Sequence, residues 1–357
     1  LWVSEIAMSN RVRVACAVGM KELGRVCGEA VQSLCKVAAA LYRGPGQLAG
    51  SRPAVPKRRF PLAVGDEGGS ALLGSDLLSR MDDDHRAVLA AIPTDFLDLT
   101  DIPKTRALFD ETRREMRSGT VPHGMTIEDH YAPGPESAPD VLVRVYRPAG
   151  AEAAAPALFW IHGGGMVLGR VEHDDDLCAA RAERLGAIVA SVEYRLAPEH
   201  PFPAPVEDCY AGLRWLRRNA DALGVDPSRI AIGGASAGGG LAAGCALLAR
   251  DRGEVALCFQ FLVYPMLDDR NETPSSFAIT DPRLWSREAN QLGWNAYLAG
   301  RAGGTDVSPY AAPARAQNLA GLPPAYINVG ELDLFLDEDI GYAQVLMRAG
   351  VPAELHV

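Results

Sequence analysis

The chain has 357 residues, 48% of them hydrophobic, which supplies a sizeable core for about two domains. Its net charge is −10 at pH 7, and no apolar run approaches the ~20 residues of a membrane span. The seven cysteines are an odd number with no C-x-x-C pair, which argues against a zinc site or a disulfide framework. These features are typical of a soluble cytoplasmic enzyme.

The first eighty residues differ in charge from the rest of the chain. They carry eleven Lys or Arg against six Asp or Glu, whereas residues 81–357 have a net charge of −15. Such asymmetry can mark an arm for nucleic acid or membrane, but no repeats or interleaved aromatic residues accompany it. We therefore expect an atypical basic extension over residues 1–80, either non-native sequence read in frame or a poorly ordered segment, and no nucleic-acid partner.

Beyond the extension, apolar strand patterns alternate with helical patterns. Helices are expected over residues 81–125, and an α/β catalytic domain over residues 126–357. The predicted strands are 141–146, 157–161, 187–192, 229–232, 258–264, 324–329 and 353–357. The predicted helices are 176–185, 206–219 and 241–249, and a further helix begins near Asp337. The alternation predicts an α/β fold with a mostly parallel, doubly wound sheet.

A G-x-S-x-G pattern at residues 234–238 lies between a predicted strand and a predicted helix. A sharp strand-to-helix turn needs glycines where the chain crowds itself, and it exposes the serine hydroxyl at the edge of the sheet. On this interpretation Ser236 is a nucleophile. The pattern alone is equally compatible with a glycine-rich turn that contains an incidental serine.

A second glycine-rich segment, His162-Gly163-Gly164-Gly165, follows another predicted strand. A hydroxyl that attacks an ester creates an oxyanion, and glycines let backbone amides approach it closely. We expect the amides of Gly163, Gly164 and Ala237 to form this oxyanion hole. A phosphate loop is the alternative, but neither G-K-[S/T] nor a G-x-G-x-x-G that opens a helix is present. His162 is expected to shape the loop rather than act as a base.

Four stretches make the chain resemble the hormone-sensitive-lipase-like branch of the α/β-hydrolases, which includes many bacterial carboxylesterases. They are residues 162–165 (HGGG), 193–203 (EYRLAPEHPFP), 234–239 (GASAGG) and 330–338 (GELDLFLDE). They occur in the family's order and spacing, and the resemblance covers residues 81–357. The family often has an acidic residue before the nucleophile, where this chain has Ala235. The resemblance implies an α/β-hydrolase fold with a helical cap.

The resemblance also implies that Asp333 is the acid of a catalytic triad, since the chain order in this fold is Ser, then Asp or Glu, then His. Such a carboxylate holds the imidazole in the right tautomer and stabilises the imidazolium. Glu331, Asp337 and Glu338 are competing carboxylates. We expect these three to be solvated or to cap the next helix.

Only one of the seven histidines, His356, follows Asp333 in the sequence. The others are His85, His123, His130, His162, His173 and His200. We expect His356 to belong to the last strand, because the resemblance implies a catalytic histidine in the loop after that strand. That histidine is expected beyond Val357, so the chain reads as a C-terminally incomplete fragment. A triad without one member loses on the order of 10⁴- to 10⁶-fold in rate, so the fragment is expected to be nearly inactive.

The resemblance further implies that the N-terminal helices, with an insertion at residues 268–300, form a cap over the active site. Four insertion residues either line an acyl pocket or attach the cap by packing, and packing is favoured: Phe277, Leu284, Trp285 and Trp294. Met166, directly after the glycine loop, is the better candidate for a wall of the substrate pocket.

Together these patterns predict a serine carboxylesterase that hydrolyses short-chain acyl esters through an acyl-enzyme, with no metal or organic cofactor. The expected partner is a small-molecule ester, with no membrane span, and a homodimer is left open. An amidase or lactonase on the same machinery remains an alternative. So does a non-catalytic receptor that uses the same pocket after losing the histidine, because a fold alone does not determine function.

Overall fold

The structure is a computed structural model that describes residues 77–116, 121–135 and 137–357. The basic extension expected over residues 1–80 therefore lies outside the described residues up to residue 76, as do Cys16, Cys27 and Cys35. The cysteines within the described part, among them Cys178 and Cys209, are free thiols.

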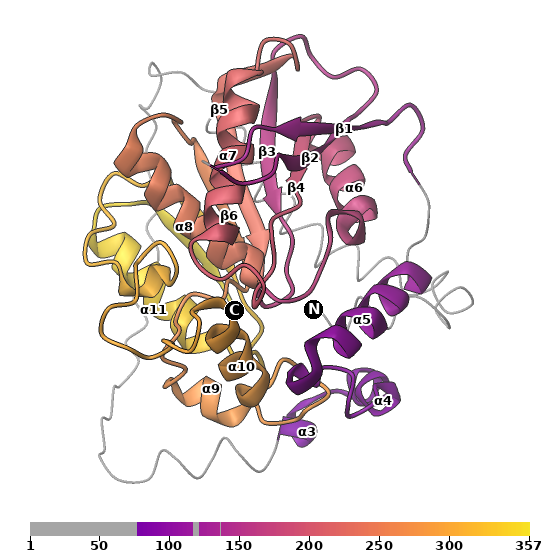
Figure 1. Cartoon of the computed structure of the whole chain (residues 1–357), viewed down its shortest axis with the longest axis vertical. Coiled ribbons are helices and arrows are strands. Elements are labelled where there is room, and N and C mark those ends of the chain that lie inside the picture. The colour runs from indigo at the N-terminus through magenta and orange to yellow at the C-terminus, as the bar shows by residue number, and fades with distance from the viewer. Residues whose placement is uncertain (1–76, 117–120, 136) are drawn as a thin grey trace, which may run out of the picture. The chain divides into compact units, whose positions relative to one another are not determined.

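Helices and strands alternate along most of the described chain (Figure 1). The strands are β1 (Thr126–Ala132), β2 (Val141–Arg147), β3 (Ala155–Ile161), β4 (Ile188–Val192), β5 (Val225–Ala235), β6 (Phe259–Val263), β7 (Ala325–Asn328) and β8 (Ala353–His356). The α-helices are α3 (Leu77–Arg80), α4 (Asp83–Ala91), α5 (Ile102–Met116), α6 (Asp175–Leu185), α7 (Ala204–Arg218), α8 (Ala237–Arg252), α9 (Pro274–Ala278), α10 (Arg287–Tyr297) and α11 (Leu336–Arg348). Short 3₁₀ turns are η1 (Leu99–Asp101), η2 (Val171–Asp174) and η3 (Pro313–Arg315).

The strands form one sheet in the order β1-β2-β4-β3-β5-β6-β7-β8. β1 pairs with β2 and β2 with β4 in antiparallel fashion, whereas every pair from β4 to β8 is parallel. The predicted α/β fold with a mostly parallel, doubly wound sheet is therefore confirmed. Because parallel strands point the same way, the loops that follow β3, β5, β6 and β7 meet at one edge of the sheet.

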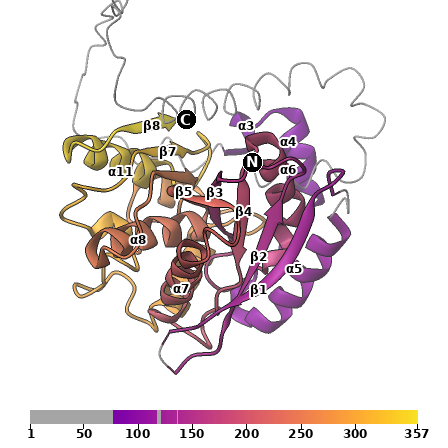
Figure 2. The same ribbon diagram turned by 90° about the horizontal axis from the view of Figure 1, so that it is seen from above.

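Helices cover both faces of the sheet, and β3 shows this most directly. Trp160 packs in a buried cluster with Cys178 and Ala179 of α6. Its neighbour Phe159 points the opposite way, so that a Cβ on Gly212 of α7 would lie 3.1 Å from the Phe159 ring. Successive side chains of a strand point to opposite faces, so α6 and α7 lie on opposite sides of the sheet (Figure 2).

Helix α8 lies beside α7 and packs closely against β5 and β6. Every residue from Ala237 to Ala249 is buried, and small side chains let neighbouring backbone approach the helix. A Cβ on Gly240 would overlap the carbonyl oxygen of Met266, and one on Gly244 would overlap that of Tyr310. Small residues are therefore required in α8, because neighbouring backbone contacts the helix closely.

Three local predictions need correction. β1 was not predicted, because it is an edge strand whose largely exposed sequence Thr-Ile-Glu-Asp-His-Tyr-Ala has no apolar alternation. The helices expected over residues 81–125 end at Met116 where described, and residues 121–125 form a turn before β1. β5 extends beyond residues 229–232 in both directions.

In the part of the chain that the structure describes, no helix combines the length and the apolar composition needed to cross a membrane.

Candidate active site

Ser236 occupies the junction between β5 and α8, as predicted. It is the residue that precedes the first turn of α8, and its backbone has φ 56° and ψ −122°. A positive φ is strained for a residue with a side chain, and such strain is typical of a serine displayed on a sharp strand-to-helix turn. The G-x-S-x-G pattern therefore forms a sharp strand-to-helix turn with a strained serine at its tip.

Two glycines make this turn sterically feasible. A Cβ on Gly234 would overlap the carbonyl of Gly238, and a Cβ on Gly238 would overlap the carbonyl oxygen of Ile161. Backbone hydrogen bonds then hold the serine: its N–H donates to Val263 O at 2.9 Å, and its carbonyl accepts from Met266 N at 2.9 Å. Ser236 is thus attached on both of its peptide groups to β6 and the loop that follows it.

The glycine loop after β3 lies directly beside Ser236. A Cβ on Gly163 would lie 3.0 Å from the carbonyl oxygen of Ala235 and 3.5 Å from the Cβ of Ser236. Ala237 is the first residue of α8, where helical amides have no intrahelical acceptor. Within the described part of the chain, the amides of Gly163, Gly164 and Ala237 donate to no other backbone group. The arrangement therefore brings Gly163 and Ala237 next to Ser236, and Gly164 follows Gly163 in the same loop.

The loop turns back tightly after these glycines. Gly164 has φ 120° and Gly165 φ 61°, and the carbonyl of Gly164 accepts from Leu168 N at 2.8 Å. His162 is buried and its ring stacks on Tyr194 with a centroid separation of 4.3 Å. The hydroxyl of Tyr194 also donates to the His162 carbonyl at 3.1 Å. These contacts are those of a residue that shapes the loop.

Asp333 lies in the loop after β7, at the same edge of the sheet. One carboxylate oxygen accepts from the Phe335 amide at 2.9 Å, and the Asp333 amide donates to Gly330 O at 3.1 Å. Burial raises the pKa of Asp333 to about 6. A carboxyl group with this pKa needs a cationic or hydrogen-bonding partner to be fully ionised near neutral pH.

Glu331, Asp337 and Glu338, the alternatives to Asp333 as the triad acid, each make contacts of their own. Glu331 is exposed and forms an ion pair with Arg80 at 2.5 Å. Asp337 accepts from the amide of Ser275 at 2.7 Å. Glu338 was expected to be solvated or to cap the helix, and this expectation is wrong, because its side chain is buried.

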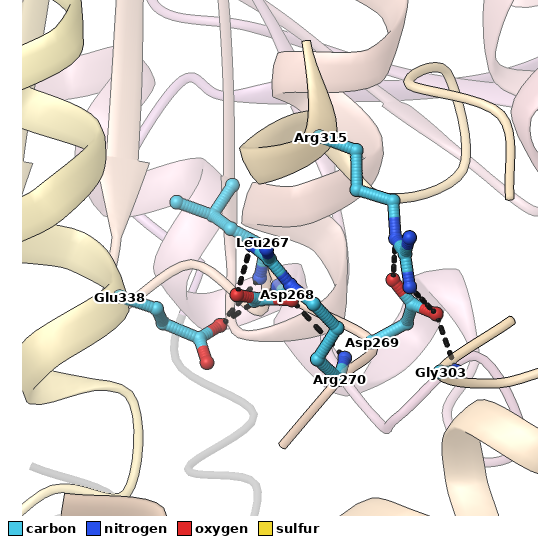
Figure 3. A network of polar contacts seen from close by, with 7 residues as sticks. All are labelled: Leu267, Asp268, Asp269, Arg270, Gly303, Arg315 and Glu338. Atoms are coloured by element: carbon cyan, nitrogen blue, oxygen red, sulfur yellow. Dashed lines mark hydrogen bonds and ion pairs between the residues drawn. The ribbon is translucent and has the colours of Figure 1, made fainter. Parts of the chain in front are cut away.

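Glu338 instead connects the loop after β6 to α11 (Figure 3). Its Oε1 accepts from the amides of Leu267 at 2.7 Å and Asp268 at 3.1 Å. Burial, together with nearby Asp268 and Asp333, raises the pKa of Glu338 well above its ordinary value. The neighbouring Asp269 binds Arg315 and accepts from Gly303 N at 2.8 Å, so this loop is held from two sides.

The helical spacing of residues in the sequence indicates that Glu338 is buried. Glu338, Tyr342 and Leu346 are all buried and recur at intervals of four along α11, on its inward face. The carboxylate thus occupies a position where the pattern calls for an apolar residue.

His356 belongs to β8, as predicted from the sequence, and it is exposed. Its Nε2 lies 2.5 Å from Glu354 Oε1, and its ring packs against Tyr326. In the described residues, no histidine makes a hydrogen bond or ion pair with Asp333 or Ser236. Ser236 and the glycine loop thus lie side by side, whereas the contacts of His356 are with Glu354 and Tyr326.

The N-terminal helix α5 is attached to the body next to the glycine loop. Arg106 donates to Val167 O at 2.7 Å and to Ala197 O at 2.6 Å. A surface groove of about 460 Å³ beside these contacts is lined by charged residues, including Arg106, Asp110 and Glu193. Neither Ser236 nor Met166 lines it. Met166 is completely buried, with φ 60°, so its expected role as a pocket wall remains a prediction.

The insertion contains α9 and α10, and its aromatic residues have different environments. Trp294 is fully buried, and Phe277 is exposed beneath the guanidinium of Arg287 at 3.7 Å. Both environments fit packing better than a pocket wall. Trp285 contacts the glycine loop at Gly165, which the sequence pattern alone could not show.

Comparisons with known proteins agree with this geometry. The family described as alpha/beta hydrolase fold matches residues 158–357. The chain is 43% identical over 222 residues to Carboxylesterase NlhH of Mycobacterium tuberculosis, which is 60% of this chain and 68% of that protein. It is 42% identical over 205 residues to Esterase LipI of the same organism, which is 57% of this chain and 64% of LipI.

Solved structures give the same result. A structure titled Bacterial Heroin Esterase superposes with a TM-score of 0.73 at 47% identity, covering 76% of this chain and 86% of that one. Esterase LipW from Mycobacterium marinum superposes with a TM-score of 0.71 at 39% identity, covering 79% and 87%. The chain therefore belongs to the α/β-hydrolase family, in its hormone-sensitive-lipase-like branch.

Proposed function

We propose that the protein is a serine carboxylesterase that hydrolyses short-chain acyl esters through an acyl-enzyme intermediate. The observation that carries the proposal is the close approach of Gly163 to Ser236: a Cβ on this glycine would lie 3.5 Å from the serine Cβ. This approach supports an oxyanion hole formed by the glycine loop beside a strained serine. The named relatives, which are esterases and carboxylesterases, support the same reaction class.

In the proposed reaction, the Ser236 hydroxyl attacks the ester carbonyl while a histidine takes its proton. The carbonyl oxygen becomes an oxyanion that accepts from the amides of Gly163, Gly164 and Ala237. The histidine then gives its proton to the leaving alcohol, and water hydrolyses the acyl-serine by the same steps in reverse order. Aligned donors of this kind are worth about 10²- to 10³-fold each in kcat.

Asp333 is proposed to orient the histidine. Its pKa of about 6 would fall when a protonated imidazole comes within hydrogen-bond distance, because an opposite charge favours the ionised carboxylate. The resemblance places that histidine in a loop after the last strand, and the proposal keeps this assignment. None of the described histidines is proposed as the base.

The substrate is proposed to be a small-molecule ester with a short acyl chain. The helices over residues 77–116 and the insertion over 268–300 are proposed to cap the site, which limits the size of the acyl group. Met166 is proposed as one wall of the pocket. We further propose a cytoplasmic location, which the free and buried thiols of Cys178 and Cys209 support. A homodimer is proposed as the assembly to test.

The proposal is tested by measuring hydrolysis of p-nitrophenyl acetate, butyrate, hexanoate and dodecanoate by the protein expressed from its complete gene. We expect the short esters to be preferred and Ser236→Ala to lower kcat/KM by about 10⁴-fold or more. Ser228→Ala is the matched control, since Ser228 is an exposed serine on the same strand and its hydroxyl donates to Asp226. It should retain full activity.

Two other outcomes would replace the proposal. If no ester is hydrolysed but a fluorescent small molecule binds and is displaced by short esters, the protein is a receptor on a hydrolase fold. If anilides or lactones are cleaved faster than the matched esters, the protein is an amidase or a lactonase. A fluorophosphonate probe that labels the protein but not the Ser236→Ala variant would support the nucleophile in either enzymatic case.

A further inference from the structure

Trp285 lies where the insertion touches the oxyanion loop. A Cβ on Gly165 would overlap Cη2 of the Trp285 indole, so the edge of the ring rests directly on the Gly165 backbone. Gly165 has a left-handed backbone with φ 61° and is two residues from Gly163, which approaches Ser236. The indole edge is therefore the outer support of a strained loop whose inner side faces the nucleophile.

A second glycine, Gly293, borders the space that the Trp285 indole occupies. A Cβ on Gly293 of α10 would lie 3.0 Å from Cζ2 of Trp285 and 3.4 Å from the carbonyl oxygen of Gly165. The benzo edge of the ring thus fills a notch between two backbones that have no side chains. Gly165 leaves the space that the ring occupies, and a side chain at Gly293 would crowd the ring.

The first turn of α10 fixes the orientation of the indole. Ser286 is the N-cap of this helix, so Trp285 and Asn290 stand at the two positions that often make a hydrophobic staple. Here the contact is a hydrogen bond, in which Trp285 Nε1 donates to Asn290 Oδ1 at 3.0 Å.

Asn290 is itself held by a second buried amide. Its Nδ2 donates to Asn271 Oδ1 at 3.0 Å, and Asn271 donates to the carbonyl of Arg287 at 3.1 Å. Asn290 is 0% exposed and Asn271 is 1% exposed. Burying two amides is costly unless both are hydrogen-bonded, and here the bonds serve to hold one indole ring in one orientation.

We propose that Trp285 is a positioning residue for the oxyanion hole. Its indole keeps the Gly165 turn in place, and this in turn fixes the direction of the Gly163 and Gly164 amides. The inference rests on the proposed serine esterase function. Donors that are aligned in advance act on the transition state more than on the bound substrate, so a displaced loop lowers kcat and leaves KM almost unchanged.

The test is a double-mutant cycle on Trp285 and Gly293 in the protein expressed from its complete gene. Trp285→Phe removes the benzo edge and the N–H donor, and we expect kcat for p-nitrophenyl butyrate to fall about 10- to 100-fold with KM changed less than about threefold. Gly293→Ala alone should also lower kcat, because its methyl group meets the indole at 3.0 Å. In the Trp285→Phe background the same methyl group enters the vacated notch and should raise kcat.

Transition-state affinity gives a readout that a purely structural role would leave unchanged. The inhibition constant of a short-chain trifluoromethyl ketone, which forms a hemiketal oxyanion on the serine, should rise by the same factor by which kcat/KM falls. The inhibition constant of the matching alcohol, which carries no oxyanion, should stay constant. Trp215→Phe is the matched control, since Trp215 is a partly buried tryptophan that packs on His130 far from the loop.

The outcomes separate this inference from the function on which it rests. If wild type shows no turnover that depends on Ser236, the esterase proposal itself is wrong. If wild type is active and Trp285→Phe keeps its kcat, or if Gly293→Ala lowers kcat equally in both backgrounds, the positioning role is overturned. Should Trp285→Phe fold poorly, Asn290→Leu provides the check: it removes the acceptor for Nε1 and should lower kcat with little change in KM, and an unchanged kcat would overturn the positioning role.

Discussion

Arg106 and Glu199 form a bidentate ion pair, with 2.7 Å between Nη1 and Oε1 and 2.8 Å between Nη2 and Oε2. The same guanidinium also donates to the backbone carbonyls of Val167 and Ala197. Arg106 thus attaches α5 both to the segment that follows the glycine loop and to the segment that follows β4. Its hydrogen bonds lower the pKa of Glu199 to about 2.

We expect Arg106→Ala to lower the free energy of unfolding by about 2 kcal/mol, because two carbonyls and a carboxylate lose a charged donor. Arg106→Lys should recover less than half of this, since an ammonium cannot reproduce the planar fork. Urea unfolding gives the energies, and hydrogen exchange should show faster exchange in α5. Lys104→Ala is the control: its exposed ion pair with Asp95 should be worth no more than about 0.5 kcal/mol. Equal effects at both positions would contradict the assignment.

Glu338→Gln should be nearly as stable as wild type at pH 5 and more stable at pH 8. Burial raises the pKa of Glu338 well above 4.5, so folding favours the protonated form. The resulting stabilisation is complete below pH 4.5 and is lost as pH rises toward the folded pKa, a loss that glutamine does not suffer. Gln still offers an oxygen to the Leu267 amide. Chemical unfolding at both pH values tests this, and a difference between variant and wild type that is independent of pH would refute it.

The effects of Asp333→Asn on stability and on activity depend on whether a histidine pairs with Asp333. The folded pKa of about 6 lies above the ordinary aspartate value of 3.8, so the carboxyl group stabilises the fold fully below about pH 4. This contribution disappears as pH rises through about 6. Where no histidine pairs with Asp333, the variant should therefore equal wild type at pH 4 and exceed it at pH 7.5. Where a histidine does pair with it, the stability gain should disappear and kcat should fall about 10⁴-fold. Unfolding curves at the two pH values, together with initial rates, provide the measurement. A variant that is less stable at pH 7.5 would contradict the raised pKa of Asp333.

Gly163→Ala should damage catalysis more than folding. Its methyl group would press on the Ala235 carbonyl at 3.0 Å and shift the loop by a few tenths of an ångström away from Ser236. Loss of donor alignment should lower kcat about 10²-fold, with a small change in Tm. By contrast, Gly238→Ala, whose methyl group would overlap the Ile161 carbonyl, should prevent normal folding. Initial rates and thermal unfolding of both variants distinguish the two cases.

Gly341→Ala should stabilise the protein without affecting the reaction. Gly341 lies within α11, and a Cβ there would have no neighbouring atom within 4 Å. Replacing a helical glycine by alanine removes backbone freedom from the unfolded chain and is worth about 0.5–1 kcal/mol. A rise in the urea midpoint with unchanged kcat is the expected result. A fall in stability would mean that α11 is not continuous at this position.

Sequence patterns predicted the centre of the sheet well, because strands buried on both faces read as continuous apolar runs. β3, β4 and β6 are of this kind. Strand β1 escaped prediction because a polar edge strand lacks this signal and forms only by pairing with β2. The position of Ser236 was predictable since its turn needs glycines at fixed neighbouring positions.

The connections around the site depend instead on contacts that local patterns do not encode. Glu338 binds an amide 71 residues earlier in the chain, and a carboxylate in the acidic first turn of a helix gives no sign of such a partner. The contact of Trp285 with Gly165 likewise requires the insertion to fold back on the loop. The sequence offered Trp285 as an aromatic residue for packing, and only the fold shows what it packs against.

The close burial of α8 has a consequence for how such an enzyme can diversify. Ser236 stands at the start of a helix whose first thirteen residues are all buried, several of them glycines in contact with neighbouring backbone. A larger side chain on α8 would collide with neighbouring backbone and shift Ser236 at the start of the helix, whether or not that side chain lay near a substrate. New substrate preferences are therefore expected outside α8, for example in those parts of the insertion between β6 and β7 that do not touch the glycine loop. The insertion can carry such changes only where Trp285 and its supports are kept.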